Sequence, residues 1–152
     1  MNDANQFLSS IVGNWTGIGA FFDTPWTQGY SVTSSLTVSN LWGSEAFELR
    51  VEYRHDGMPS FESLTLVSTD SVPRFWTIDS MGVLPEASGQ VEMEDGNLIL
   101  KRQSPKGSNL TVFQLYPQGL SMKVDFAPAG GGTALAVAAS DLKRKDRGGQ
   151  SG

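Results

Sequence analysis

The feature that most constrains the fold is the hydrophobic period, which changes to two soon after the start of the chain. From residue 13 onward apolar and polar residues alternate, most clearly over 30–38 and 47–53. A period of two is typical of a strand with one buried face and one face in water. Ten such runs can be delimited, at 13–23, 29–40, 44–55, 59–69, 73–80, 88–94, 97–104, 108–116, 119–127 and 132–143. The sequence therefore predicts an all-β protein.

The links between these runs are short and rich in turn residues. Gly, Asn or Asp occurs at 55–57, 95–97, 105–107 and 117–119, where tight hairpins require residues that tolerate a positive φ. Short hairpins join sequential antiparallel strands, and closing such a meander removes its two long edges. A β-sandwich is the competing architecture, but it needs long crossover connections. We therefore predict a single closed antiparallel up-and-down β-barrel of about ten strands.

One short helix is expected before the first strand. Asp3 is placed to cap a helix that runs to about Val12, and Phe7, Leu8 and Ile11 share its apolar face. Such a helix can close one end of a barrel.

The segment Gly-Asn-Trp-Thr-Gly-Ile-Gly at 13–19 is expected to open the barrel. Trp15 offers a large apolar plate, and Gly13, Gly17 and Gly19 share its phase along the strand. Glycines two apart remove side chains from one face, so the strand can bend or be closely approached. We interpret these four residues as structural barrel closure. The alternative is that Gly17 and Gly19 leave empty volume for a ligand.

The Gly-x-Trp-x-Gly-x-Gly motif, following a short helix and preceding an all-antiparallel meander, resembles the lipocalin-like superfamily of calycins. The similarity is nearest to uncharacterised bacterial lipocalin-like domains, with nitrobindin and the fatty-acid-binding proteins as relatives in shape. The resemblance implies a barrel that holds a small molecule. Nitrobindin-like proteins hold haem through a histidine late in the chain, and this sequence has no histidine after His55. Haem is therefore not expected, and no cofactor or metal is predicted.

Several polar and aromatic residues are candidates to touch a ligand. Polar side chains in apolar phases have this potential because a buried polar atom needs a partner. Arg102 could clamp a carboxylate, as the fatty-acid-binding resemblance suggests, or could instead reach solvent at a strand end. His55 precedes a turn and is either a rim ligand or a solvated residue, and Trp26 is either a lid over the opening or packed on the rim. The candidates are Trp26, Ser34, Tyr53, His55, Trp76, Arg102, Gln114 and Tyr116.

Length and charge bound the remaining possibilities. The 152 residues suit one domain, which we assign to 1–143, with a flexible basic and glycine-rich tail at 144–152. The net charge is −5, and basic residues crowd the end of the chain at Lys143, Arg144, Lys145 and Arg147. An acidic body repels phosphate backbones, so a nucleic-acid partner is not expected. Cysteine is absent, and neither a signal peptide nor a membrane span is visible, which favours the cytoplasm.

Searches for catalytic motifs find no nucleophile elbow, phosphate loop or metal-binding helix. Three functions therefore remain open. The first is non-covalent binding of a small hydrophobic or amphipathic molecule, as a carrier or sensor. The second is an isomerase, cyclase or hydratase on the same barrel, in which Tyr53, His55, Asp79 or Tyr116 transfers a proton. The third is a packed barrel that acts as an interaction module, and the chain is expected to be a monomer or a homodimer.

Overall fold

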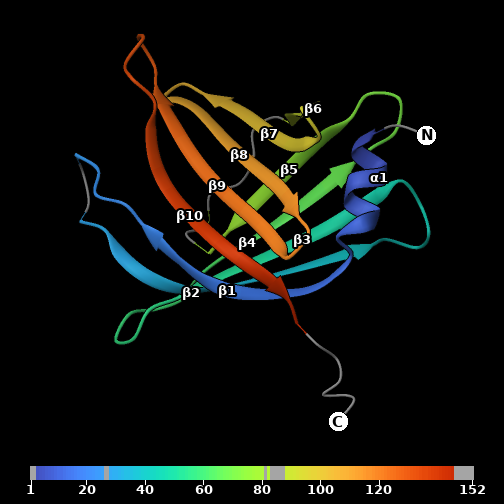
Figure 1. Cartoon of the computed structure of the whole chain (residues 1–152). Helices are drawn as coiled ribbons and strands as arrows, with labels where there is room; N and C mark the ends of the chain where they lie inside the picture. The colour runs from blue at the N-terminus through green and yellow to red at the C-terminus, as the bar shows by residue number, and fades with distance from the viewer. Residues whose placement is uncertain (1–2, 26–27, 81, 83–87, 146–152) are drawn as a thin grey trace.

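The structure is a computed structural model that describes residues 3–25, 28–80, 82 and 88–145. The chain forms a closed ten-stranded barrel (Figure 1). One helix precedes the strands and lies at one end of the barrel, which we call the α1 end. No helix in these described ranges is long and apolar enough to cross a membrane. The elements are α1 (Asp3–Ser10), β1 (Gly13–Phe21), β2 (Tyr30–Asn40), β3 (Ala46–Arg54), β4 (Phe61–Ser68), β5 (Arg74–Asp79), β6 (Gly89–Glu94), β7 (Asn97–Ser104), β8 (Gly107–Tyr116), β9 (Gly119–Pro128) and β10 (Leu135–Arg144).

The strands form a meander in which every strand pairs antiparallel with its neighbours in sequence, and β1 pairs with β10 to close the ring. The predicted closed up-and-down barrel is confirmed, and the sandwich is excluded. All ten runs found from the period of two correspond to strands, and the helix ends at Ser10, two residues before the expected end.

The α1 end of the barrel is filled by side chains. Leu8 and Ile11 from the helix region are fully buried, and Trp15 from β1 is only 4% exposed. The Trp15 indole Nε1–H donates a hydrogen bond of 2.9 Å to the carbonyl of Ile11, so the buried polar atom of this ring is satisfied. Leu36, Phe47, Leu49, Leu98, Phe113, Leu120 and Leu142 complete this packed half of the core. The helix therefore plugs the barrel.

Arg144 ties the last strand to the end of the helix. Its guanidinium donates to the carbonyl of Val12 at 2.7 Å and to the carbonyl of Ser10 at 3.0 Å, and lies 4.4 Å from the centroid of the Trp15 ring. Carbonyls at the end of a helix lack partners within the helix, and a cation there satisfies them. Arg144 was expected to begin a flexible tail, whereas it is the last residue of β10 and its side chain contacts the end of α1, the link after α1, and β1.

The glycines of β1 allow β10 to approach closely. A Cβ at Gly17 would overlap the backbone carbonyl of Asp141, and a Cβ at Gly19 would overlap the carbonyl of Ala139 and the side chain of Ser140. Neither glycine lines the interior hollow. Gly17 and Gly19 therefore allow β10 to lie close to β1 where the two strands pair.

Candidate ligand-binding cavity

The barrel is hollow at the end opposite α1, which we call the open end. The cavity has a volume of about 220 Å³ and is lined by β1, β3, β4, β5, β7, β8, β9 and β10. Two neighbouring residues of β10, Val137 and Ala138, both line it because a bulge between Ala136 and Ala138 shifts the register with β9. The same fold therefore has one packed end and one end with internal space.

The wall built by β1, β3 and β4 is aromatic. The ring of Tyr53 lies 5.0 Å from the ring of Phe21 and 6.1 Å from that of Phe61, measured between centroids. Phe21 and Phe61 are 6.5 Å apart and nearly perpendicular. These distances are those of favourable edge-to-face and tilted ring pairs. The wall offers flat apolar surface to a ligand.

The wall built by β7 and β8 is polar. Arg102 and Asn109 are directly opposite each other in the β7–β8 register, and both line the cavity. Within the described part of the chain, neither side chain has a hydrogen bond or ion pair with another residue. Both side chains are half-buried and their polar atoms remain accessible to water, so an anionic oxygen that enters the cavity can replace water as their partner. Thr111 adds a hydroxyl to the same wall.

Tyr53 supplies a polar group to the aromatic wall. Burial raises the pKa of its hydroxyl from 10.0 to about 12, because the charged form would be poorly solvated there. The hydroxyl therefore stays protonated at neutral pH and can donate a hydrogen bond. The nearby Thr77 hydroxyl is already paired with that of Thr65 at 2.8 Å.

The candidates predicted from the sequence lie in different parts of the barrel. Tyr53 and Arg102 line the cavity. Ser34 is fully buried but does not line it, since its hydroxyl pairs with that of Ser140 at 2.7 Å. His55 lies at the rim beside the ring of Tyr30, and its Nδ1–H donates to the carbonyl of Ser31 at 2.6 Å. Trp26 lies outside the described residues.

Trp76, Gln114 and Tyr116 lie on the outer face of the barrel and do not line the cavity. Trp76 alternates with the buried Phe75 and is stacked under Arg74, whose guanidinium carbon is 5.3 Å from the ring centroid. In β8 Phe113 is buried, whereas Tyr116 is 41% exposed. The residues of β8 that face inward include the polar Asn109 and Thr111, so in the sequence this face resembles one that is exposed to water.

Asn109 and Thr111 were missed by the sequence analysis, as were the lining residues Phe21, Phe61, Ser63 and Thr77. One signal could have found Asn109. Only two residues separate Ser104 from Gly107, and a two-residue hairpin loop sets the register. Counting back from this turn places Asn109 opposite Arg102.

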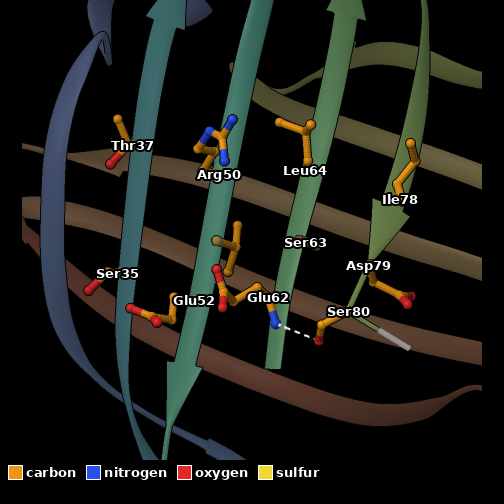
Figure 2. Close-up of a pocket in the computed structure, with 11 residues that line it drawn as sticks. Ser35, Thr37, Arg50, Glu52, Glu62, Ser63, Leu64, Ile78, Asp79 and Ser80 are labelled. Carbon is orange, nitrogen blue, oxygen red and sulfur yellow. Dashed lines mark hydrogen bonds between the residues drawn. The ribbon is translucent and has the colours of Figure 1, made fainter. Parts of the chain in front are cut away.

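A larger hollow of about 470 Å³ lies on the outer face of β2 to β5 (Figure 2). Leu64 and Ile78 lie beside Arg50, Glu52 and Glu62 on neighbouring strands in this view. Arg50 and Glu52 in this hollow already have ion-pair partners, with Arg50 3.0 Å from Glu48 and Arg54 3.1 Å from Glu52. The Arg50 side chain is 63% exposed, so water screens its charge.

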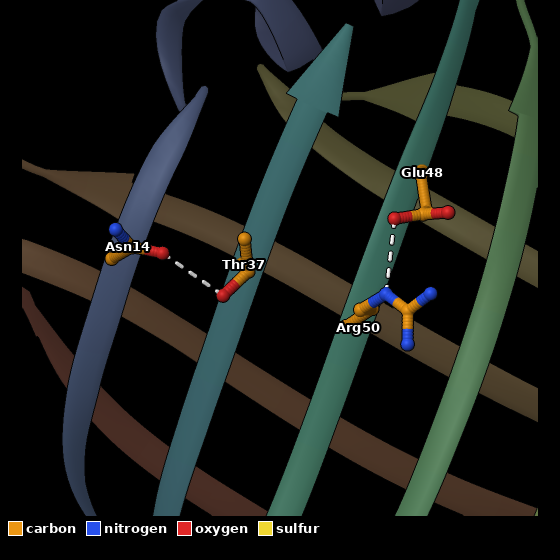
Figure 3. Close-up of polar contacts among 4 residues, drawn as sticks. All are labelled: Asn14, Thr37, Glu48 and Arg50. Atoms are coloured by element: carbon orange, nitrogen blue, oxygen red, sulfur yellow. Dashed lines mark hydrogen bonds and ion pairs between the residues drawn. The ribbon is translucent and has the colours of Figure 1, made fainter. Parts of the chain in front are cut away.

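The same outer face carries the hydrogen bond from Thr37 to Asn14, 3.0 Å long, beside the Arg50–Glu48 pair (Figure 3). As expected from the alternation of β3, these residues belong to a solvated face. The interior cavity, with its groups that lack protein partners, is therefore the better candidate site.

No protein-family model and no curated protein matches the chain. Several solved structures are similar in fold, and two of them are described here. Rv2717c from M. tuberculosis matches with a TM-score of 0.71 at 16% identity, covering 96% of this chain and 99% of its own. The S-type phycobiliprotein lyase CPES from Guillardia theta matches with a TM-score of 0.66 at 14% identity, covering 94% of this chain and 93% of its own. Both likenesses show that this chain shares their barrel fold.

Proposed function

We propose that the protein binds a small amphipathic molecule with an anionic end, non-covalently, in the open-end cavity. The observation that carries this proposal is the pair Arg102 and Asn109, which line the cavity and have no partner among the described residues. Opposite them stands a wall of aromatic rings. A ligand with a carboxylate at one end and a flat apolar body satisfies both walls.

The volume of the cavity limits the size of the ligand that can bind. A cavity of about 220 Å³ lies below the usual range for drug-sized ligands, roughly 300–1,000 Å³. At the packing density of protein interiors this space holds roughly a dozen non-hydrogen atoms. A bicyclic aromatic carboxylate is of this size, so we choose 2-naphthoate as a probe.

The enzymatic alternative has less support. Of the four residues considered for proton transfer, His55 and Tyr116 do not line the cavity. Tyr53 does, but a hydroxyl with a pKa of about 12 exchanges its proton reluctantly at neutral pH. Only Asp79 remains, and one carboxylate does not define a reaction. The packed interaction barrel is disfavoured by the volume of the cavity itself.

The proposal is tested by titrating the protein with 2-naphthoate and following the ligand's fluorescence. We expect Arg102→Gln to weaken binding by about tenfold or more, because a hydrogen bond to a charged group contributes about 1.5–3 kcal/mol. Arg74→Gln on the outer face is the matched control and should leave affinity unchanged. The neutral analogue 2-naphthalenemethanol should bind both variants alike. Binding of 2-naphthoate that is insensitive to Arg102→Gln, or no binding by the parent protein, would contradict the proposal.

A further inference from the structure

The hydroxyl of Tyr53 is a polar group of the cavity that the proposed function has not used. The side chain lines the cavity and is 8% exposed, and within the described part of the chain its hydroxyl makes no hydrogen bond. No polar side-chain atom in that part of the chain is both fully enclosed and unpaired, so water still reaches the Tyr53 oxygen. A ligand that fills the cavity displaces this water. The hydroxyl then lacks a partner unless the ligand supplies one.

The aromatic wall holds this hydroxyl in a defined place. The Tyr53 ring packs against Phe21 and Phe61, with centroids 5.0 Å and 6.1 Å away. The oxygen lies on the axis of the ring, so once the ring is fixed only the O–H bond can still rotate. A donor whose position is already fixed loses little freedom when it bonds to a ligand. The hydroxyl is protonated at neutral pH, because burial raises its pKa to about 12.

Tyr53 and the polar wall lie on opposite sides of the barrel. In the ring of ten strands, β3 and β8 are five positions apart in either direction. Tyr53 belongs to β3, whereas Asn109 belongs to β8 and is paired with Arg102 on β7. A ligand that crosses the cavity from the polar wall therefore ends at the wall that holds Tyr53.

The group that meets Tyr53 is expected to be neutral. The described residues that line the cavity from β1, β3 and β4 are Phe21, Tyr53, Phe61 and Ser63, and none of them is charged. A charged group of either sign at this wall would lose its water without gaining a counter-charge, which costs far more than burying a neutral group. A neutral oxygen needs only one hydrogen bond, and the Tyr53 hydroxyl can donate it.

We infer that the ligand is an aromatic monocarboxylate with a neutral oxygen at the end remote from the carboxylate, and that this oxygen bonds to the hydroxyl of Tyr53. The inference rests on the proposed function and defines the class of ligand more closely. Arg102 and Asn109 bind one end of the molecule, the aromatic rings cover its body, and Tyr53 recognises the other end. Tyr53 is thus a residue that determines specificity.

The inference is tested with 6-hydroxy-2-naphthoate, in which the hydroxyl and the carboxylate lie at opposite ends of the long axis. Its isomer 3-hydroxy-2-naphthoate, with the two groups side by side, is the matched control ligand. Isothermal titration calorimetry at neutral pH gives the Kd of both and of 2-naphthoate. We expect the parent protein to bind 6-hydroxy-2-naphthoate about fivefold more tightly than 2-naphthoate, as a neutral hydrogen bond permits. The 3-hydroxy isomer should gain no more than about twofold.

Tyr53→Phe removes the hydroxyl and keeps the ring with its contacts to Phe21 and Phe61. We expect this variant to bind 6-hydroxy-2-naphthoate about fivefold or more weakly than the parent, because the ligand hydroxyl is then buried without a partner. Its affinity for 2-naphthoate should stay within about twofold. Tyr30→Phe is the matched control, since Tyr30 contacts Phe21 at 5.2 Å but does not line the cavity. This control should leave both affinities unchanged.

Three results would overturn the inference. Equal weakening of both ligands by Tyr53→Phe would mean that Tyr53 acts by packing or at the carboxylate. A preference for the 6-hydroxy ligand that survives Tyr53→Phe, or that is lost in Ser63→Ala instead, would assign the far end to another group. No preference in the parent, with 2-naphthoate still weakened by Arg102→Gln, would overturn this inference alone and leave the proposed function standing. Failure of the parent to bind any of the three naphthoates would overturn both.

Discussion

The two ends of the barrel are built from the same strands but differ in how their polar groups are satisfied. At the α1 end the indole of Trp15 and the guanidinium of Arg144 both bond to carbonyls near the end of the helix. At the open end Arg102 and Asn109 face a cavity and lack partners among the described residues. One end thus stabilises the fold, while the other retains groups that a ligand would satisfy.

The largest expected effect contrasts a phenylalanine from each end. Phe113→Ala at the α1 end should lower the free energy of unfolding by about 3–5 kcal/mol, because its ring is fully packed and a cavity would remain. Phe61→Ala at the open end should lower it by only about 1 kcal/mol, since it enlarges a hollow that already exists. Urea unfolding of the two variants measures the difference. Equal losses would mean that the open end is packed as tightly as the α1 end.

A pH titration tests the burial of Tyr53. Its pKa is raised from 10.0 to about 12 in the folded protein, so the folded state holds this proton more tightly than the unfolded state. The contribution to stability is complete below pH 10 and is lost as the pH rises from 10 to about 12, a loss of about 2–3 kcal/mol.

The difference in unfolding free energy between the parent protein and Tyr53→Phe isolates this effect from other groups that titrate at high pH. We expect that difference to change across pH 10 to 12 and to be constant below it. A constant difference throughout would mean that the Tyr53 hydroxyl is well solvated in the folded protein.

The two arginines give a smaller contrast. Arg144→Ala should destabilise the protein by about 2 kcal/mol, because it removes two hydrogen bonds and a cation–π contact at the α1 end. Arg102→Ala should change stability by about 0.5 kcal/mol or less, because no described residue loses a partner. Thermal unfolding of both variants checks this order. The reverse order would place a structural role at the open end.

The smallest effect is expected for His55→Ala at the rim. Loss of its hydrogen bond to Ser31 should cost about 0.5–1 kcal/mol in urea unfolding, since the group is partly solvated. The affinity for 2-naphthoate should stay within about twofold, because His55 does not line the cavity. A large loss of affinity would instead make the rim part of the binding site.

The strands were predictable because each has one buried face and one face in water, which produces a hydrophobic period of two in the sequence. The same rule failed in β8, where the interior is polar. Asn109 and Thr111 face the cavity while Leu110 and Val112 face outward, so in this part of β8 the composition of the two faces is inverted relative to a solid core. Arg102 was identified because its neighbours Leu98 and Leu100 keep the apolar phase of β7.

The role of Arg144 could not be predicted for a different reason. Its side chain lies in a run of basic residues, which locally resembles a solvated tail. Its partners, Ser10, Val12 and Trp15, are more than a hundred positions away in sequence. No local pattern records a contact of this range, since only the closure of the barrel brings the two ends of the meander together.

The pairing of β1 with β10 has a consequence for how the protein is made. The wall cannot be completed until β10 has left the ribosome, and at about 5–20 residues per second this follows the emergence of β1 by roughly 6–25 s. Throughout this interval the edge of β1 that later pairs with β10, including Gly17 and Gly19, is unpaired. We therefore expect chaperones to protect nascent chains of this protein until the last strand has been synthesised.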